Sequence, residues 1–235
     1  MSLLHVIILA VVQGLAELLP VSSSAHVVVA EKLMGLDPSS PEMTLLLVML
    51  HTGTMFAVIV YFWNKWRTTY FRDRDTFKRF AALIVLATVI TGVIGEALIK
   101  IIEKFGFHTP PHADVEQLFS HLELIAPALA AVGILILVAG VLDRTNRFGQ
   151  PEDAVGLDAK QSGVIGAVQG LCLPFRGFSR SGATISTGML AGVAKDRAEA
   201  FSFALAVVLT PPVVGREALR LIKAQHLNGG LDMTS

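Results

Sequence analysis

The stretch from Met43 to Trp63 constrains this chain most, because it contains no charged side chain. A helix needs about 20 mostly apolar residues to cross a bilayer, and this stretch is long enough. Three further stretches also qualify: Phe80 to Ile102, Leu122 to Leu142 and Glu199 to Leu221, the last with a Pro-Pro pair expected to kink it. Hydrophobic residues make up 53% of the sequence and charged residues 16%, against about 25% charged in soluble domains. These patterns predict an all-α polytopic membrane protein.

Two related segments fit a full membrane span poorly. Residues 12–26 read VQGLAELLPVSSSAH, and residues 168–184 read VQGLCLPFRGFSRSGAT. Each begins in an apolar run, breaks at proline and at glycine or serine, and continues into a second short apolar run. Two half-length helices joined by a break are typical of a re-entrant hairpin, which enters the bilayer and returns to the same side. We predict such hairpins over residues 3–35 and 162–194.

Basic residues in the connecting loops predict the orientation, because cytoplasmic loops carry an excess of Lys and Arg. Residues 64–79 contain six basic side chains, whereas residues 103–123 contain only Lys104. The first loop is therefore predicted to be cytoplasmic and the second external, and residues 143–161, with three basic side chains, cytoplasmic again. Three spans then separate the two hairpins, so the hairpins should enter from opposite faces as an inverted-topology repeat.

The repeat divides the chain into two predicted units. The first covers residues 1–156 and consists of a hairpin plus three transmembrane helices. The second covers residues 157–235 and consists of a hairpin plus one transmembrane helix. It reads as truncated, because the first unit predicts about two more helices. Folds of this kind place their site where the broken segments meet near the middle of the membrane.

Charge and cysteine content exclude several other classes of protein. The formal net charge is +0, which leaves no basic surface for nucleic acid. Cys172 is the only cysteine, so an internal disulfide framework and a cysteine-based metal site are excluded, and we interpret it as a packing residue. No basic residue precedes the apolar N-terminal run, which is a poor match to a signal peptide. We expect this run to remain in the mature protein.

The breaks suggest an anion site inside the membrane. Helices that restart near residues 22–25 and 179–182 would point their free N–H groups and positive dipole ends at the same region. Arg180 adds a guanidinium, whose fork of donors suits phosphate oxygens. Burying an arginine at this depth costs roughly 2.5–3.5 kcal/mol on insertion scales, so a partner or a function should offset it.

The first segment supplies groups of a different chemistry. Gln13 and Glu17 are four residues apart, on one face of a helix, so both can reach the same point. Three serines and His26 follow the break within about one turn. A hydroxyl, an imidazole, a carboxylate and a guanidinium together are typical of phosphoryl hydrolysis, as nucleophile, proton carrier, metal or proton partner, and charge clamp.

Each of these groups also has a purely structural interpretation. Ser22, Ser24 and Ser181 are at least as well explained as N-caps. The histidines at 5 and 51 are interpreted as packing residues, and Glu96 with Lys100 as an ion pair at the interface. Glu17 and Arg180 could pair and merely lock the two repeats together, although charges inside a membrane are functional by default.

The two motifs resemble those of one family. ELLPVSSSAH and GFSRSGATIS are similar to the two signature motifs of the bacterial undecaprenyl-pyrophosphate phosphatases of the bacitracin-resistance type, and the similarity covers nearly the whole chain. The resemblance implies a multi-pass enzyme of the bacterial inner membrane that hydrolyses undecaprenyl pyrophosphate to the monophosphate, recycling the carrier lipid for cell-wall synthesis. It further implies a site that opens to the periplasm, a divalent cation, Mg or Ca, and extra C-terminal spans.

The resemblance also assigns residues. The family's motif residues fall on Glu17, Ser23, His26 and Arg180. In the mechanism this implies, Ser23 attacks the terminal phosphorus or orients water, His26 handles the proton, Arg180 clamps charge, and Glu17 positions a metal or His26. Substrate contacts are expected from Ser22, Ser24, Ser179, Ser181, Gly182, Thr184 and Arg176, and metal contacts from Glu17 and Gln13.

Two positions depart from the family pattern, and both bear on metal use. Many members carry glutamate where this chain has Gln13, and proline where it has Arg176, so we expect weaker metal binding here.

The alternative function is a membrane transporter or a polyprenyl-phosphate flippase that uses the same anion site, because inverted repeats with broken helices are common in transporters.

Overall fold

The computed structural model describes residues 2–17, 19, 21–38, 40–106, 122–144, 156–175 and 177–229. These residues form helices and connecting turns, with no strand among them. The helices in chain order are α1 (Leu3–Glu17), α2 (Ser23–Leu33), α3 (Pro41–Thr69), α4 (Arg74–Gly106), α5 (Leu122–Arg144), α6 (Ala159–Cys172), α7 (Arg180–Leu190) and α8 (Lys195–Gly229).

In the described part of the chain, four helices are long and apolar enough to cross a membrane, which confirms the predicted all-α polytopic class. Their spanning parts are Glu42–Thr69, Arg74–Ile102, Ile125–Asp143 and Lys195–Gly215. Helices α3 and α4 extend beyond the apolar stretches read from the sequence, because backbone hydrogen bonding continues past the hydrocarbon region. Asp73 marks the start of α4, where its Oδ1 accepts from the backbone N–H of Thr76 at 2.9 Å. Helix α8 continues through Pro211 and Pro212.

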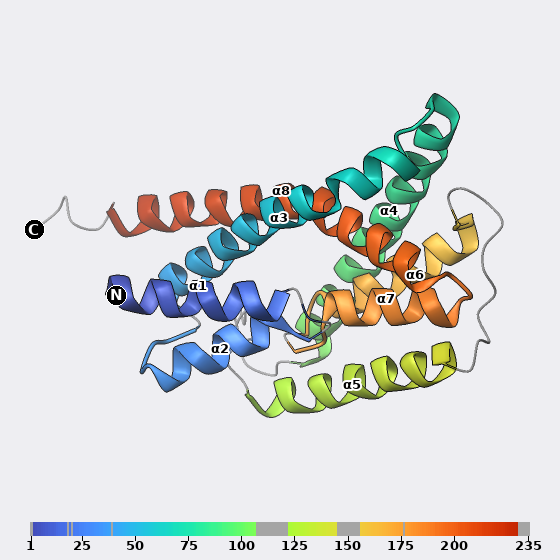
Figure 1. Cartoon of the computed structure of the whole chain (residues 1–235). Helices are drawn as coiled ribbons and strands as arrows, with labels where there is room; N and C mark the ends of the chain where they lie inside the picture. Colours follow the sequence, from blue (N-terminus) through green and yellow to red (C-terminus); the bar gives the residue numbers. More distant parts are fainter. Residues whose placement is uncertain are drawn as a thin grey trace, which may run out of the picture.

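The short helices pair into two helical hairpins. Helix α1 packs against α2, and α6 packs against α7. In Figure 1 the two hairpins open toward opposite sides of the view, and their tips meet near the centre of the molecule. With 15 and 14 residues, α1 and α6 are too short to cross a bilayer alone. Entry from opposite membrane faces, and the division into repeats at residue 156, stay predictions.

The second hairpin is held by close helix packing. Helix α6 lies against α4, where Gly166 and Gly170 face the backbone of the neighbouring helix. Thr91 of α4 donates a hydrogen bond to the Gly166 carbonyl at 2.9 Å, and Ser162 of α6 donates to the Leu83 carbonyl at 2.7 Å. Small residues that allow backbones to approach, together with hydroxyl bonds between helices, are typical of membrane helix packing.

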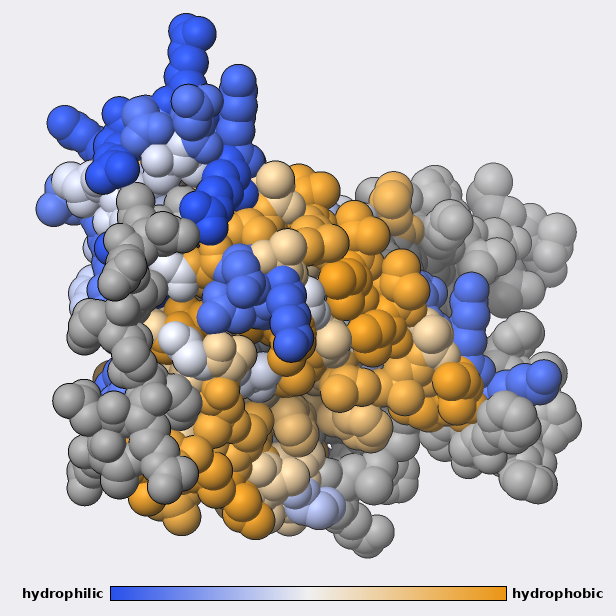
Figure 2. All heavy atoms as spheres, turned by 90° about the vertical axis from the view of Figure 1, so that its right-hand side faces the viewer, coloured by the Kyte–Doolittle hydropathy of each residue, from blue (hydrophilic) through white to orange (hydrophobic). Residues whose placement is uncertain are grey.

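Hydrophilic and apolar residues are distributed unevenly over the surface (Figure 2). Hydrophilic residues gather at one corner of the view in Figure 2, where α3 turns into α4, and apolar residues cover much of the remaining described surface. On α4 the side chains of Val85, Val89 and Val93 are more than half exposed. An apolar face that is exposed to this extent on a long helix is what contact with lipid requires.

Candidate active site

Each hairpin breaks immediately before a serine that caps the next helix. Ser22 Oγ accepts a hydrogen bond from the Ala25 backbone N–H at 3.4 Å, before α2. Ser179 Oγ accepts one from the Gly182 backbone N–H at 3.1 Å, before α7. The bond at Ser22 confirms its N-cap interpretation. The same interpretation is wrong for Ser24 and Ser181, which lie inside α2 and α7, and the cap of α7 is Ser179. Both N-termini, with their positive dipole ends, lie at the wall of one pocket.

The second break depends on glycine. Gly177 has φ +104°, and a Cβ added there would lie 2.8 Å from the carbonyl oxygen of Ile125 in α5. A side chain at this position would therefore be strained twice, by its backbone conformation and by a clash with backbone. The turn that directs α7 toward the pocket thus needs glycine at 177. The preceding residue, Arg176, lies outside the described residues.

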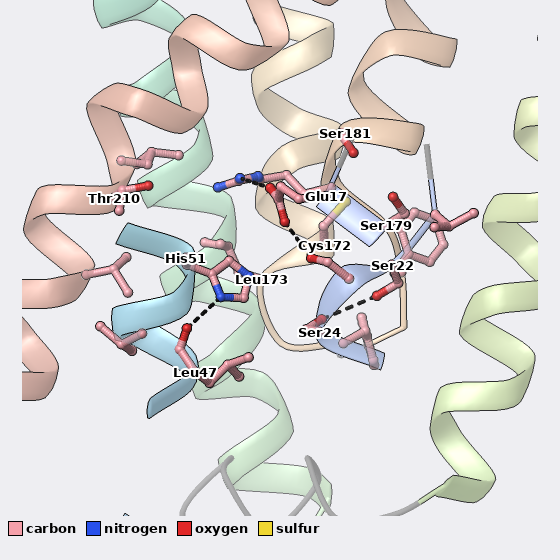
Figure 3. A pocket seen from close by; sticks show the side chains of 18 of the residues that line it. Glu17, Ser22, Ser24, Leu47, His51, Cys172, Leu173, Ser179, Ser181 and Thr210 are labelled. Carbon is pink, nitrogen blue, oxygen red and sulfur yellow. Dashed lines mark hydrogen bonds and ion pairs between the residues drawn. The ribbon is translucent and has the colours of Figure 1, made fainter. Parts of the chain in front are cut away.

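The pocket has a volume of about 320 Å³ and a wall of mixed character, close to the lower limit of about 300 Å³ for ligand sites. Figure 3 shows polar side chains converging on it from several helices. Apolar residues of α3, α8 and the break before α7 complete the wall. The predicted site residues that line it are Glu17, Ser22, Ser23, Ser24, Ser179, Arg180 and Ser181.

Glu17 is the centre of the polar network. Its Oε2 accepts a hydrogen bond from Ser23 Oγ at 2.6 Å and another from Gln13 Nε2 at 2.9 Å. Its Oε1 lies 3.8 Å from Arg180 Nη2. The Glu17 side chain is 12% exposed and that of Arg180 is 30% exposed, so the guanidinium stays accessible from the pocket. The ion pair therefore joins the two hairpins and leaves part of Arg180 available to a ligand.

Other predicted residues lie elsewhere. The His26 side chain is exposed, its Nδ1 lies 2.7 Å from the Ser22 carbonyl oxygen, and it does not line the pocket. Thr184 Oγ1 lies 2.6 Å from Ser202 Oγ of α8, and neither Thr184 nor Gly182 is in the pocket wall. Gln13 is fully buried behind Glu17. The catalytic role of His26 and the substrate and metal roles of the other residues stay predictions.

His51 is a pocket residue that the sequence analysis interpreted as packing. It lies in the middle of α3, and its ring lines the pocket together with Glu17 and Arg180. One signal in the sequence could have identified it: it is a titratable side chain within an otherwise uncharged span, where polar residues are functional by default.

The chemistry available at this pocket is attack on a bound anion. A serine hydroxyl hydrogen-bonded to a carboxylate is the arrangement of an activated nucleophile. A guanidinium and two helix N-termini at the same pocket provide donors for negative charge that develops during reaction. Fold and site together define a multi-pass membrane protein with a partly polar pocket where its two helical hairpins meet.

Comparison with known proteins gives the family. Residues 6–233 match the family described as bacitracin resistance protein BacA, and the chain belongs to this family. It is 60% identical over 230 residues to undecaprenyl-diphosphatase 2 of Acinetobacter baylyi, across 98% of this chain and 78% of that protein. It is 34% identical to undecaprenyl-diphosphatase 1 of Burkholderia pseudomallei, across 96% of this chain and 78% of that protein. The same identity holds for undecaprenyl-diphosphatase 2 of Stutzerimonas stutzeri, across 96% and 79%.

Proposed function

We propose that this protein hydrolyses undecaprenyl diphosphate to undecaprenyl phosphate and inorganic phosphate, and so recycles the lipid carrier of cell-wall synthesis. The observation that carries the proposal is the 2.6 Å hydrogen bond from Ser23 to Glu17 at the pocket lined by Arg180. Similarity to the undecaprenyl-diphosphatase of Acinetobacter baylyi, at 60% identity, supports the choice of substrate. The apolar part of the pocket wall suits the prenyl chain next to the diphosphate.

The proposed reaction begins at Ser23. Its Oγ attacks the terminal phosphorus while its proton passes to Glu17, and the bond from that phosphorus to the bridging oxygen breaks. Undecaprenyl phosphate leaves with the bonding electron pair. Water then cleaves the phosphoserine, which releases inorganic phosphate and restores the serine hydroxyl. Arg180 and the N-termini of α2 and α7 stabilise the charge on the phosphoryl oxygens in both steps.

The chain offers oxygen ligands for a divalent cation. Among the described residues no three His, Cys, Asp or Glu side chains are grouped to hold a metal ion. However, Mg²⁺ is commonly held by one or two carboxylates together with substrate phosphates. Glu17 supplies the carboxylate, and Gln13 Oε1 is a buried oxygen without a hydrogen-bond partner. We therefore propose that Glu17 and Gln13 would hold a cation together with the substrate; when bound, it would supply positive charge against the diphosphate.

The proposed location is the bacterial inner membrane, with the site open to the periplasm. The basic connection between α3 and α4 supports this orientation, because positive loops remain in the cytoplasm. In this arrangement the α1–α2 hairpin enters from the periplasmic face, and the α6–α7 hairpin from the cytoplasmic face.

Phosphate release by the purified protein tests the function. The full chain, in detergent with Mg²⁺, should release inorganic phosphate from undecaprenyl diphosphate, and Ser23→Ala should abolish the release. A wild-type protein that releases no phosphate but moves the lipid across vesicle membranes would overturn the proposal in favour of transport.

A further inference from the structure

His51 sits where the elements of the site meet. It lines the main pocket and also a smaller cavity next to it, and Glu17, Arg180 and Thr210 line both. Glu17 Oε1 also lies 3.8 Å from Arg180 Nη2. In Figure 3 the His51 imidazole lies among the labelled pocket residues. Helix α3 therefore contributes an imidazole to a site whose motif residues come from the two hairpins.

A hydrogen bond fixes the orientation of this ring. His51 Nδ1 lies 2.8 Å from the carbonyl oxygen of Leu47, one turn earlier in α3. A carbonyl oxygen only accepts, so Nδ1 carries the hydrogen and Nε2 is the second functional nitrogen. An imidazole held in this way has a defined tautomer and direction, which is how proteins position a histidine that contacts a ligand.

The motif histidine does not occupy an equivalent position. His26 Nδ1 also bonds a carbonyl one turn earlier, that of Ser22 at 2.7 Å. Its side chain is nevertheless exposed, and it is absent from the pocket wall. Among the described residues, His51 is thus the imidazole that lines the pocket. The other titratable groups there are Glu17 from α1, Cys172 from α6 and Arg180 from α7.

We propose that His51 is a further substrate-contacting residue of this enzyme, an inference that rests on the proposed phosphatase function. With Nδ1–H bonded to Leu47, Nε2 contacts an oxygen of the diphosphate held between Ser23 and Arg180. It donates to that oxygen when the ring carries both protons, and it accepts from a phosphate hydroxyl when the ring carries one. In a pocket of about 320 Å³, a diphosphate that meets both hairpins also meets this wall of α3.

Two substitutions at position 51 separate contact from packing. His51→Gln keeps a polar nitrogen near the position of Nε2, whereas His51→Leu keeps bulk and removes every polar atom. We expect His51→Leu to lower kcat/KM for undecaprenyl diphosphate by roughly 100-fold, the scale for loss of one donor to a reacting anion. His51→Gln should recover activity to within about tenfold of wild type. The same two substitutions at His5, a histidine of α1 outside the pocket wall, should leave kcat/KM unchanged.

Calorimetric titration with inorganic diphosphate provides a readout independent of turnover. Wild type and His51→Gln should bind it, and His51→Leu should bind it at least tenfold more weakly at an unchanged melting temperature. The inference is wrong if His51→Leu keeps kcat/KM and diphosphate affinity within twofold of wild type, or if His51→Gln loses as much as His51→Leu. If wild type binds diphosphate but releases no phosphate, the proposed function fails and the titrations still decide the role of His51.

Discussion

At the scale of single residues, the site depends on how the Glu17 carboxylate is shared. One oxygen accepts from Ser23 and Gln13, and the other faces Arg180. The carboxylate therefore lies next to both the proposed nucleophile, Ser23, and the Arg180 guanidinium that would hold the substrate. Replacing any of these partners changes the charge or the hydrogen-bond donors around this one carboxylate.

Arg180→Lys tests the geometry of the clamp. Lysine keeps the positive charge but loses the planar fork that can bind two phosphate oxygens at once. We expect kcat/KM to fall by roughly 100-fold or more, as for the loss of a transition-state donor, while insertion and purification stay normal. Phosphate release against substrate concentration measures the effect. Near-normal turnover by this variant would refute the assigned role of Arg180.

Gln13→Glu tests the expected weak dependence on metal. Gln13 donates to Glu17 at 2.9 Å, so a glutamate there would place a second carboxylate against the first. Two neighbouring carboxylates repel unless a cation lies between them. Phosphate release measured against free Mg²⁺ should therefore depend more steeply on the metal in this variant than in wild type.

The control for Gln13→Glu is the same substitution at Gln161. This residue closes a capping box at the start of α6 and is not in the pocket wall. Glutamate keeps the capping box and loses only the bond from Gln161 Nε2 to the Ala191 carbonyl, which lies outside the pocket wall. Its metal curve should match that of wild type. Superimposable curves for all three proteins would leave the charge argument at Gln13 without support.

At the scale of elements, the structure depends on how closely α4 and α6 approach. A Cβ on Gly166 would lie 2.5 Å from the Ala87 carbonyl oxygen, which is backbone and cannot move without shifting a helix. Gly166→Ala should therefore destabilise the protein by about 1–3 kcal/mol, the range for overpacking. Thermal unfolding in detergent measures this. Gly163→Ala is the control, because its Cβ would lie 3.4 Å from a side-chain atom of Ile90, and its melting temperature should barely change.

The helices were predictable because bilayer thickness imposes a length on each apolar stretch, and the breaks because proline, glycine and serine mark helix ends. The pairing of Glu17 with Arg180 could be expected, because the breaks of the two motifs were predicted to meet. The position of His51 could not, since it depends on how α3 rotates against the hairpins. The bond from Thr184 to Ser202 likewise depends on packing between α7 and α8, which no local pattern records.

At the scale of the whole molecule, the two hairpins meet at one pocket. Each supplies a serine-capped helix N-terminus to one pocket, and each carries one partner of the Glu17–Arg180 pair. Two positive dipole ends can face each other stably only if negative groups lie between them. Glu17 provides one such group, and a bound diphosphate would provide others. If the hairpins enter from opposite membrane faces, both tips can reach the same depth in the bilayer. The chain segments that connect the helices then need not cross one another.

Cysteine labelling tests this entry from opposite faces. Asp37 follows the first hairpin and Lys160 lies at the start of the second, and both are exposed. The native Cys172 is buried, so it should not react with the label. If the positive connection between α3 and α4 is cytoplasmic, a membrane-impermeant maleimide should label Asp37→Cys in intact spheroplasts. It should label Lys160→Cys only after the membrane is opened. Asp75→Cys, in the basic connection itself, is the control and should behave like Lys160→Cys. Labelling of both hairpin positions from one side would show that the hairpins share a face, and the inverted repeat would then be wrong.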